Sequence, residues 1–250
     1  MKRIWIMTIF PEYFEAFLEH GIAAQAFSGS RGIDFEVKTL NIREYGFDKH
    51  GSVDDYPYGG GPGMIMRADV LKRSLYEGVI EAGGYGEDFR EKLHIVYTGP
   101  RGKVWSNYLC REFAGKHLTT QGKDLVFLCG RYEGVDERFL QNYVDETISL
   151  GDYVLTGGEL AVLAILDSAI RFAPEVLGNK AGANEDSFED SLLEHPQFTR
   201  PREFEGENVP AILLSGHHQK IAEYQKEQQK IETQKHRPDL WERYQELENE

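Results

Sequence analysis

Apolar and polar positions in the first two thirds of the chain switch repeatedly between strand-like and helix-like spacing. Residues 4–9 (IWIMTI) form a near-continuous apolar run, which predicts a strand buried on both faces. Residues 35–42 alternate apolar and polar positions and predict a second strand. Residues 93–97 and 125–129 (LHIVY and LVFLC) predict two more buried strands, each ending in a glycine-containing turn.

Helical spacing separates these strands. The apolar positions Phe14, Phe17, Leu18 and Ile22 recur every three or four residues, as on one face of a helix. Further helices are predicted over residues 68–82, 106–116 and 160–172. This order of strands and helices predicts an α/β fold, with a mostly parallel sheet and helices on both faces.

The last third of the chain reads differently. A polar, acidic and glycine-containing stretch interrupts the apolar pattern, and helical sequence follows at about residues 218–235 and from Pro238 onward. We therefore expect three parts: an α/β domain over residues 1–178, a flexible linker over 179–194, and a small helical domain over 195–250.

Composition narrows the class of protein. A chain of 250 residues can bury a sizeable core without disulfides. Its two cysteines, Cys110 and Cys129, exclude a disulfide framework and a thiolate-rich zinc site, and both are expected in the core. The sequence has no apolar run near the ~18 residues that span a bilayer, and its N-terminus does not resemble a signal peptide. A cytoplasmic protein without a membrane partner is expected.

Net charge argues against a generic nucleic-acid binder. The formal charge is −14 at pH 7. Proteins that bind nucleic acid usually gain much of their affinity by neutralising phosphates with lysine and arginine. An interaction with RNA therefore needs sharper evidence than composition.

Four glycine-rich motifs carry the candidate chemistry: residues 53–64 (VDDYPYGGGPGM), 97–102, 129–138 and 149–159. None fits a P-loop or the G-x-G-x-x-G dinucleotide motif. In open α/β sheets, ligands bind outside the carboxyl ends of strands, so the last three motifs suggest one shared pocket. Each motif by itself is also explained by ordinary turn chemistry, and the first by a flexible loop.

These motifs, together with short ones further along, resemble the bacterial tRNA (guanine-N1)-methyltransferase (TrmD) family of the SPOUT class. The similarity runs almost end to end. Its most specific parts are GRYEGVDER at 130–138 and SLGDYVLTGGE at 149–159, followed by DSF at 186–188, TRP at 199–201 and RPDL at 237–240.

The resemblance implies a SPOUT-type sheet whose C-terminal part forms a deep trefoil knot, a homodimer, and S-adenosylmethionine as the methyl donor. The donor-binding positions that it implies are Tyr97, Thr98, Gly99, Pro100, Gly130, Glu133, Leu150, Gly151, Asp152, Tyr153, Val154, Leu155, Gly157 and Gly158. Apolar side chains and glycines suit an adenine that lies against the backbone. Glu133 is equally well explained as an acid favoured at a helix N-terminus.

The family's reaction is methylation of N1 of the guanosine immediately 3′ of the anticodon in tRNA. Asp186 matches the family's general base, and Arg171 matches an arginine that stabilises negative charge on O6. From the residues alone, Asp186 reads as one solvated acid in a linker and Arg171 as a cation at a helix C-terminus. The family also implies Mg²⁺, but the sequence contains no dedicated ligand set, so no metal ligand is assigned.

The resemblance implies that tRNA is the partner, and the candidate phosphate contacts are Lys49, Arg200, Arg202, Lys220 and Arg237. Basic residues that the family usually has near Pro57 and in the helix after residue 218 are missing here, which puts the strength of tRNA binding in question. Two other functions stay open: a non-catalytic SPOUT-like RNA-binding protein, and a nucleotide-binding regulator that does not bind RNA. The predicted base and arginine favour the enzyme.

Overall fold

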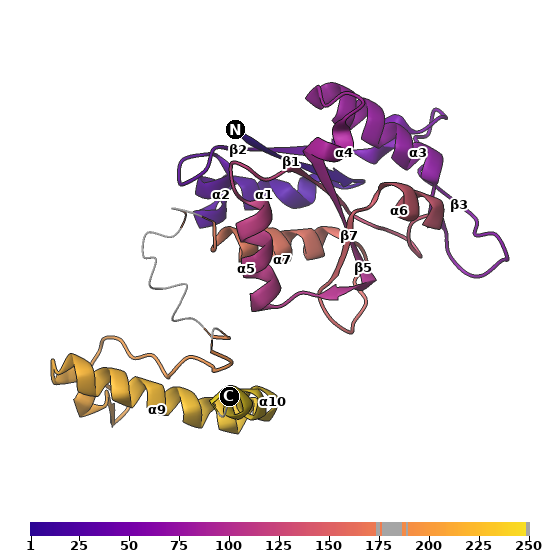
Figure 1. Ribbon diagram of the computed structural model, residues 1–250. Helices are drawn as coiled ribbons and strands as arrows, with labels where there is room; N and C mark the ends of the chain where they lie inside the picture. The colour runs from indigo at the N-terminus through magenta and orange to yellow at the C-terminus, as the bar shows by residue number, and fades with distance from the viewer. Residues whose placement is uncertain (174–175, 177–186, 189, 249–250) are drawn as a thin grey trace. The chain divides into compact units, whose positions relative to one another are not determined.

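A computed structural model describes residues 1–173, 176, 187–188 and 190–248 of the chain. The chain divides into two compact units, residues 1–178 and 179–250. The first unit contains a parallel five-stranded sheet in the order β2-β1-β6-β5-β7 (Figure 1). Within the described residues, no helix has the length and apolar character needed to cross a membrane.

The parallel sheet confirms the four strands that the sequence predicts and adds a fifth. Its strands are β1 (Lys2–Thr8), β2 (Phe35–Asn41), β5 (Leu93–Val104), β6 (Asp124–Leu128) and β7 (Glu146–Ser149). β7 was not predicted, because its four residues ETIS are too short and too polar to show a strand pattern. It completes the edge of the sheet beside β5.

β5 is longer than the sequence predicts. We expected the strand to end in a glycine turn after Tyr97, but it runs for 12 residues to Val104. The pairing of β5 with β7 is irregular here, because both Thr98 and Lys103 lie opposite Ile148. The glycine-containing segment between them is therefore a bulge inside a strand, which projects from the sheet without ending it.

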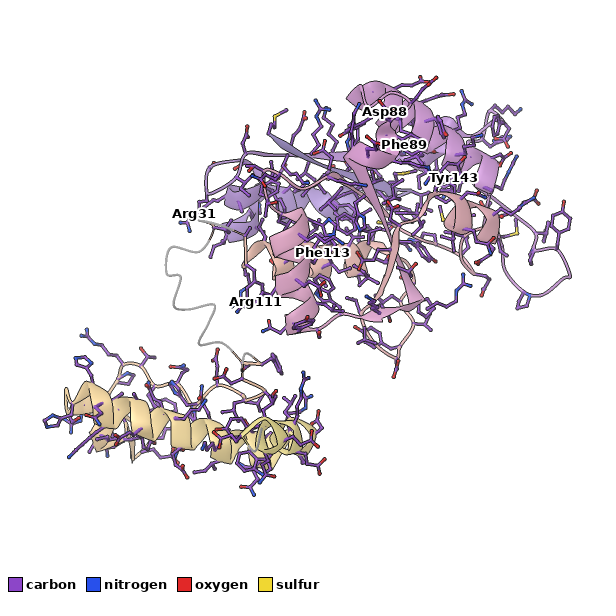
Figure 2. All side chains as sticks on the ribbon, viewed as in Figure 1. Arg31, Asp88, Phe89, Arg111, Phe113 and Tyr143 are labelled. Carbon is purple, nitrogen blue, oxygen red and sulfur yellow. The ribbon has the colours of Figure 1, made fainter. Side chains whose placement is uncertain are left out.

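Helices cover both faces of the sheet and form two cores, as predicted for an α/β fold. On one face, α1 (Glu15–Glu19), α2 (Gly21–Phe27), α5 (Asn107–His117) and α7 (Glu159–Ile170) pack against alternate residues of β1, including Ile4 and Ile6. On the other face, α3 (Ala68–Arg73), the π-helix η3 (Ser74–Glu81), α4 (Phe89–Lys92) and α6 (Glu137–Tyr143) cover Trp5 and Met7. In Figure 2, Phe113 marks the first core, and Phe89 and Tyr143 mark the second.

Two predicted helices are interrupted. The helix expected from Phe14 onward is divided into the short helix η1 (Pro11–Phe14), α1 and α2, and Gly21 at the break has a φ of +81°. The helix expected over residues 68–82 changes from α3 to the wider η3 at Ser74. Smaller elements complete the unit: η2 (Ile42–Tyr45) and the hairpin of β3 (Asp54–Asp55) and β4 (Ile65–Met66). Cys110 and Cys129 are both buried in the first core, as expected.

The second unit is mainly helical. It contains a small hairpin of β8 (Glu203–Phe204) and β9 (Glu207–Asn208), the short helix η4 (Ala211–Leu214), and the helices α9 (His218–His236) and α10 (Pro238–Glu248). Tyr244 of α10 is buried, with Nζ of Lys230 in α9 5.3 Å from its ring centre. The trefoil knot in the first unit stays a prediction.

Candidate functional site

A pocket opens at the bulge of β5, beyond the ends of β6 and β7 and beside the start of α7. Its walls come from three separate parts of the chain, residues 97–100, 130–134 and 148–158, with Ala161 beneath them. The carboxyl ends of adjacent parallel strands lie at the same edge of a sheet, which brings these segments together. Three of the four glycine-rich motifs therefore share one cavity, of about 210 Å³.

Most of the residues predicted to bind a methyl donor line this pocket. Asp152 lies in the same loop but is exposed and does not contribute to the wall. The wall also includes residues that the sequence analysis did not single out: Arg131, Tyr132, Gly134, Ile148, Ser149, Thr156 and Ala161. Five of them lie inside the glycine-rich motifs, which was the available signal, whereas Ile148 and Ala161 lie just outside the motif at 149–159.

Gly158 allows two backbone segments to touch at the floor of the pocket. Its N–H donates to the carbonyl of Gly130 over 2.8 Å. A Cβ atom at Gly158 would lie 2.9 Å from both Cα of Cys129 and N of Gly130. Glycine is thus required here to pack the start of α7 against the end of β6, and not only to let a ligand approach the backbone.

The pocket contains a buried polar atom that has no partner in the described part of the chain, Oγ1 of Thr98. Burying a hydroxyl without a hydrogen bond costs about 1–3 kcal/mol, so such atoms commonly mark a ligand or water position. Burial also raises the pKa of the neighbouring Tyr97, so its phenol stays protonated at pH 7. The pocket therefore offers uncharged polar groups to a ligand.

The rim of the pocket is apolar and exposed. Tyr153, Val154 and Leu155 are 58%, 93% and 36% exposed, although they follow each other in a loop. Consecutive exposed apolar side chains are uncommon on a protein surface unless something binds there. Together with the glycine floor, they form a surface suited to a flat aromatic ligand.

A buried ion pair holds the pocket together. Nε of Arg131 donates to Oε2 of Glu159 over 2.9 Å, and the hydroxyl of Thr8 donates to Oε1 of Glu159 over 2.7 Å. The guanidinium of Arg131 also donates to the carbonyl of Thr156 over 3.1 Å, and it lies 4.6 Å from the ring centre of Phe10. Arg131 thereby connects the end of β6 to the loop before α7 and to the first residue of that helix.

The first glycine-rich motif reaches the pocket through Glu133. The backbone N–H of Glu133 donates to the carbonyl of Met64 over 3.0 Å. A Cβ at Gly63 would lie 2.3 Å from Cγ of Glu133, and Gly63 has a φ of +81°. The end of the loop 59–63, at Gly63, therefore lies against the side chain of a pocket residue, an arrangement that the sequence spacing does not reveal.

Of the two predicted catalytic residues, the structure describes Arg171 but not Asp186. Arg171 is the residue directly after α7, in the first unit. Asp186 lies outside the described residues, as does most of the predicted linker. The pairing of a base with an arginine therefore stays a prediction.

The predicted phosphate contacts are distributed over both units. Lys49 is exposed in the first unit, and Arg200, Arg202 and Lys220 are exposed in the second. Arg237 already has an anionic partner, because its guanidinium donates to both carboxylate oxygens of Asp239, over 2.8 and 2.6 Å. It is the least available of the five for an RNA phosphate.

Comparison with known proteins places the chain in a family. The model of the family described as tRNA (Guanine-1)-methyltransferase TrmD matches residues 1–243. The tRNA (guanine-N(1)-)-methyltransferase of Ruegeria sp. (strain TM1040) is 42% identical over 98% of this chain and 95% of its own length. Enzymes with the same name from Staphylococcus epidermidis (strain ATCC 12228) and Clostridium botulinum (strain Hall) are 41% and 43% identical over 97% of this chain, which covers 91% and 92% of their lengths. The chain therefore belongs to the tRNA (guanine-1)-methyltransferase family.

Proposed function

We propose that this protein transfers a methyl group from S-adenosylmethionine to N1 of the guanosine immediately 3′ of the anticodon in tRNA. The observation that carries the proposal is the glycine-floored pocket at the bulge of β5 and the ends of β6 and β7, in a chain that matches the family over almost its whole length. The family's relatives are named for methylation of tRNA guanine at N1.

The pocket's residues fit such a donor. The apolar rim of Tyr153, Val154 and Leu155 suits the faces of an adenine, and Thr98 Oγ1 is a buried group that still needs a hydrogen bond. Glu133 supplies a carboxylate in the wall, which favours a positively charged ligand such as a sulfonium. S-adenosylmethionine supplies an electrophilic methyl group when bound.

The acceptor nitrogen needs a base. N1 of guanine carries a proton at neutral pH, so it becomes a good nucleophile only as that proton leaves. We assign the proton's acceptance to the carboxylate of Asp186. The guanidinium of Arg171 would donate to O6, where negative charge develops as the proton leaves.

Only the family resemblance implies a requirement for Mg²⁺. Among the described residues that line the pocket, Glu133 is the single carboxylate. Mg²⁺ prefers an octahedral shell of oxygens, often one or two carboxylates and several waters. The described wall does not form such a shell, and we derive no step through the ion.

Two partners belong to the proposal: tRNA and a second copy of the chain. We assign phosphate contacts to Lys49, Arg200, Arg202 and Lys220. Arg237 would contact a phosphate only by giving up its pairing with Asp239. With only these phosphate contacts assigned, we expect a weak salt dependence of tRNA binding, because each neutralised phosphate contributes about −0.7 to −0.9 to the slope of log K against log[salt].

The decisive experiment replaces the base. Asp186→Asn keeps the size and polarity of the side chain but cannot accept the proton. With labelled methyl donor and unmodified tRNA, we expect transfer to fall by about 10²–10⁴-fold, the contribution of a general base, while calorimetry shows unchanged donor affinity. Asp190→Asn is the matched control, since this nearby acid is exposed and pairs with Lys226 over 3.4 Å.

Three outcomes would contradict parts of the proposal. A loss below tenfold in Asp186→Asn would remove Asp186 as the base. Equal losses of methyl transfer in Asp186→Asn and Asp190→Asn would mean that the negative charge of the segment matters, and not a proton acceptor at Asp186. A wild-type protein that binds the donor and tRNA but transfers no methyl group would favour the non-catalytic RNA-binding alternative.

A further inference from the structure

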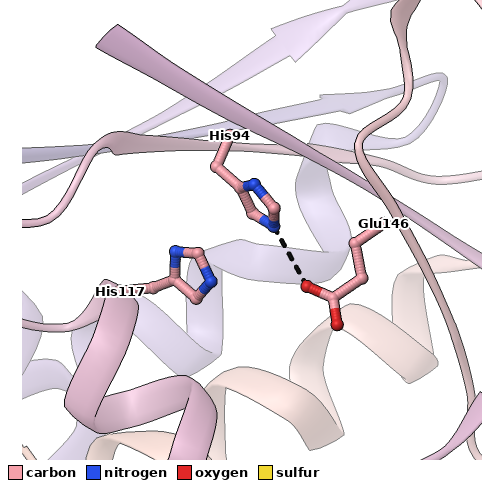
Figure 3. A group of neighbouring side chains, drawn as sticks. All are labelled: His94, His117 and Glu146. Carbon is pink, nitrogen blue, oxygen red and sulfur yellow. Dashed lines mark hydrogen bonds and ion pairs between the residues drawn. The ribbon is translucent and has the colours of Figure 1, made fainter. Parts of the chain in front are cut away.

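Three metal-ligating side chains converge at a place that the proposed reaction does not use. His94 lies near the start of β5, His117 is the last residue of α5, and Glu146 is the first residue of β7 (Figure 3). Nε2 of His94 lies 3.0 Å from Oε2 of Glu146. The two imidazole rings stack with centres 4.2 Å apart and planes 20° apart. One ligand atom from each residue falls within 4.8 Å of the others.

The cluster is held in the fold but can be reached from outside. His117 is only 4% exposed, and the side chains of His94 and Glu146 are 13% and 29% exposed. All three line a cavity of about 370 Å³, which also includes Asp145 and Glu112. An ion could therefore enter through the cavity and find its ligands already positioned by two strands and a helix.

A second carboxylate lies near the other ring nitrogen of His94. Oδ2 of Asp145 lies 3.9 Å from Nδ1 of His94, on the side of the ring away from Glu146. The same oxygen accepts a hydrogen bond from the backbone N–H of Ile95 over 2.8 Å, which holds Asp145 in place. Carboxylates that accept the second ring N–H are typical of metal-binding histidines, because they keep the proton on one nitrogen and leave the other for the metal. Asp145 would take this position if the present 3.9 Å closed to hydrogen-bond distance.

We propose that His94, His117 and Glu146 form a binding site for a divalent transition metal, with Zn²⁺ as the expected ion. Two imidazole nitrogens and one carboxylate oxygen are a common zinc ligand set, and a water from the cavity would complete a tetrahedron. The set does not suit Mg²⁺, which prefers oxygen ligands. This inference is independent of the proposed methyl transfer.

Metal binding would draw the three side chains closer together. Zn²⁺ binds at about 2.0–2.1 Å from nitrogen, which places neighbouring ligand atoms about 3.3 Å apart. The ligand atoms now lie up to 4.8 Å apart and the two imidazole rings are stacked, so binding would both shorten these distances and turn the rings out of their stack.

The acidic side chains that line the cavity outnumber the basic ones, which favours a cation. Lys103 and Lys116 line it and oppose a positive ion, whereas Glu112, Asp145 and Glu146 attract one. A bound ion would join β5, β7 and the end of α5. Because β7 leads directly into the loop of the donor pocket, the metal would stabilise the edge of the sheet on which that loop depends.

The test is calorimetric titration of the chelator-treated full chain with Zn²⁺, and separately with Mg²⁺. We expect one Zn²⁺ per chain, no competition from millimolar Mg²⁺, and a Tm about 5–10 °C higher when Zn²⁺ is 100 times Kd. His94→Gln and Glu146→Gln should each weaken Zn²⁺ binding at least tenfold, and Asp145→Asn about tenfold through the outer position. Substituted Co²⁺ should show the visible absorption of a tetrahedral site.

A matched control separates this site from casual surface binding. His236 also pairs with a carboxylate, Glu232, over 3.3 Å, but on an exposed face of α9. His236→Gln should leave the Zn²⁺ affinity unchanged. Zn²⁺ binding that is absent from the wild type, or that survives both His94→Gln and Glu146→Gln, would overturn the proposal and leave the cluster as a hydrogen-bonded pair with a stacked histidine.

Discussion

Arg131 offers the sharpest test of how the pocket is held together. Arg131→Met keeps an unbranched side chain but removes the guanidinium, and with it the contact to the ring of Phe10. The change leaves the carboxylate of Glu159 buried, with a side chain only 1% exposed and Thr8 as its remaining hydrogen-bond donor. It also frees the carbonyl of Thr156 in the donor loop. We therefore expect losses in both stability and donor affinity.

The expected magnitude follows from burial. Removing one partner of a buried ion pair costs about 3–5 kcal/mol, because the other charge stays desolvated. For a chain of this size, that corresponds to a fall in Tm of about 6–20 °C. Arg138→Met is the matched control in the same motif: Arg138 pairs with Asp136 over 2.6 Å, but its side chain is 73% exposed. An exposed pair should contribute at most ~1 kcal/mol.

The assay is urea unfolding followed by tryptophan fluorescence in a Trp241→Phe background. The signal then comes from Trp5 and Trp105, which both lie in the first unit. Adding Glu159→Gln to Arg131→Met should restore part of the lost stability, because glutamine carries no charge to bury. A loss below ~1 kcal/mol in Arg131→Met, or a double variant less stable than Arg131→Met alone, would refute the assignment of the pair as a buried charge network.

Three further predictions concern the ligand, the pH and the assembly. A Cβ at Gly157 would lie 2.1 Å from Nε of Arg131, so Gly157→Val should displace that guanidinium and lower donor affinity at least tenfold by calorimetry, and normal binding would mean that the pocket is misplaced. Because burial lowers the pKa of His117 to about 3 and an unfolded histidine titrates near 6.5, the unfolded chain binds the extra proton between these values. The stability that neutral His117 contributes is therefore complete above pH 6.5 and is lost as the pH falls, by about 2 kcal/mol at pH 5. Urea unfolding midpoints measured against pH in the presence of a chelator should vary less for His117→Gln than for the wild type, and an equal pH dependence of the two proteins would contradict this. If each site combines the donor loop of one chain with the linker of another, mixed Asp186→Asn and Gly157→Val chains should regain activity that neither has alone, and no recovery after verified exchange would mean that each site lies within one chain.

The sequence by itself determined the fold class and the location of the pocket. Apolar runs at residues 4–9 and 125–129 are unambiguous because a strand covered by helices on both faces must be apolar on both faces. Glycine-rich motifs next to such strands lie near the carboxyl edge of a parallel sheet, so a pocket shared by residues 97–100 and 130–134 could be predicted, although residues 97–100 lie in a bulge inside β5 and not after its end.

Only the tertiary structure decided which residues depend on one another. The strand β7 has too few apolar residues to be predicted, and it exists because the edge of β5 supplies its hydrogen bonds. The contact of Arg131 with Glu159 joins residues 28 positions apart. His94 and Glu146 are 52 positions apart. Hydrophobic periodicity reports which side of an element is buried, whereas the partner of a buried polar group depends on how distant elements pack, and that information appears only when the chain is folded.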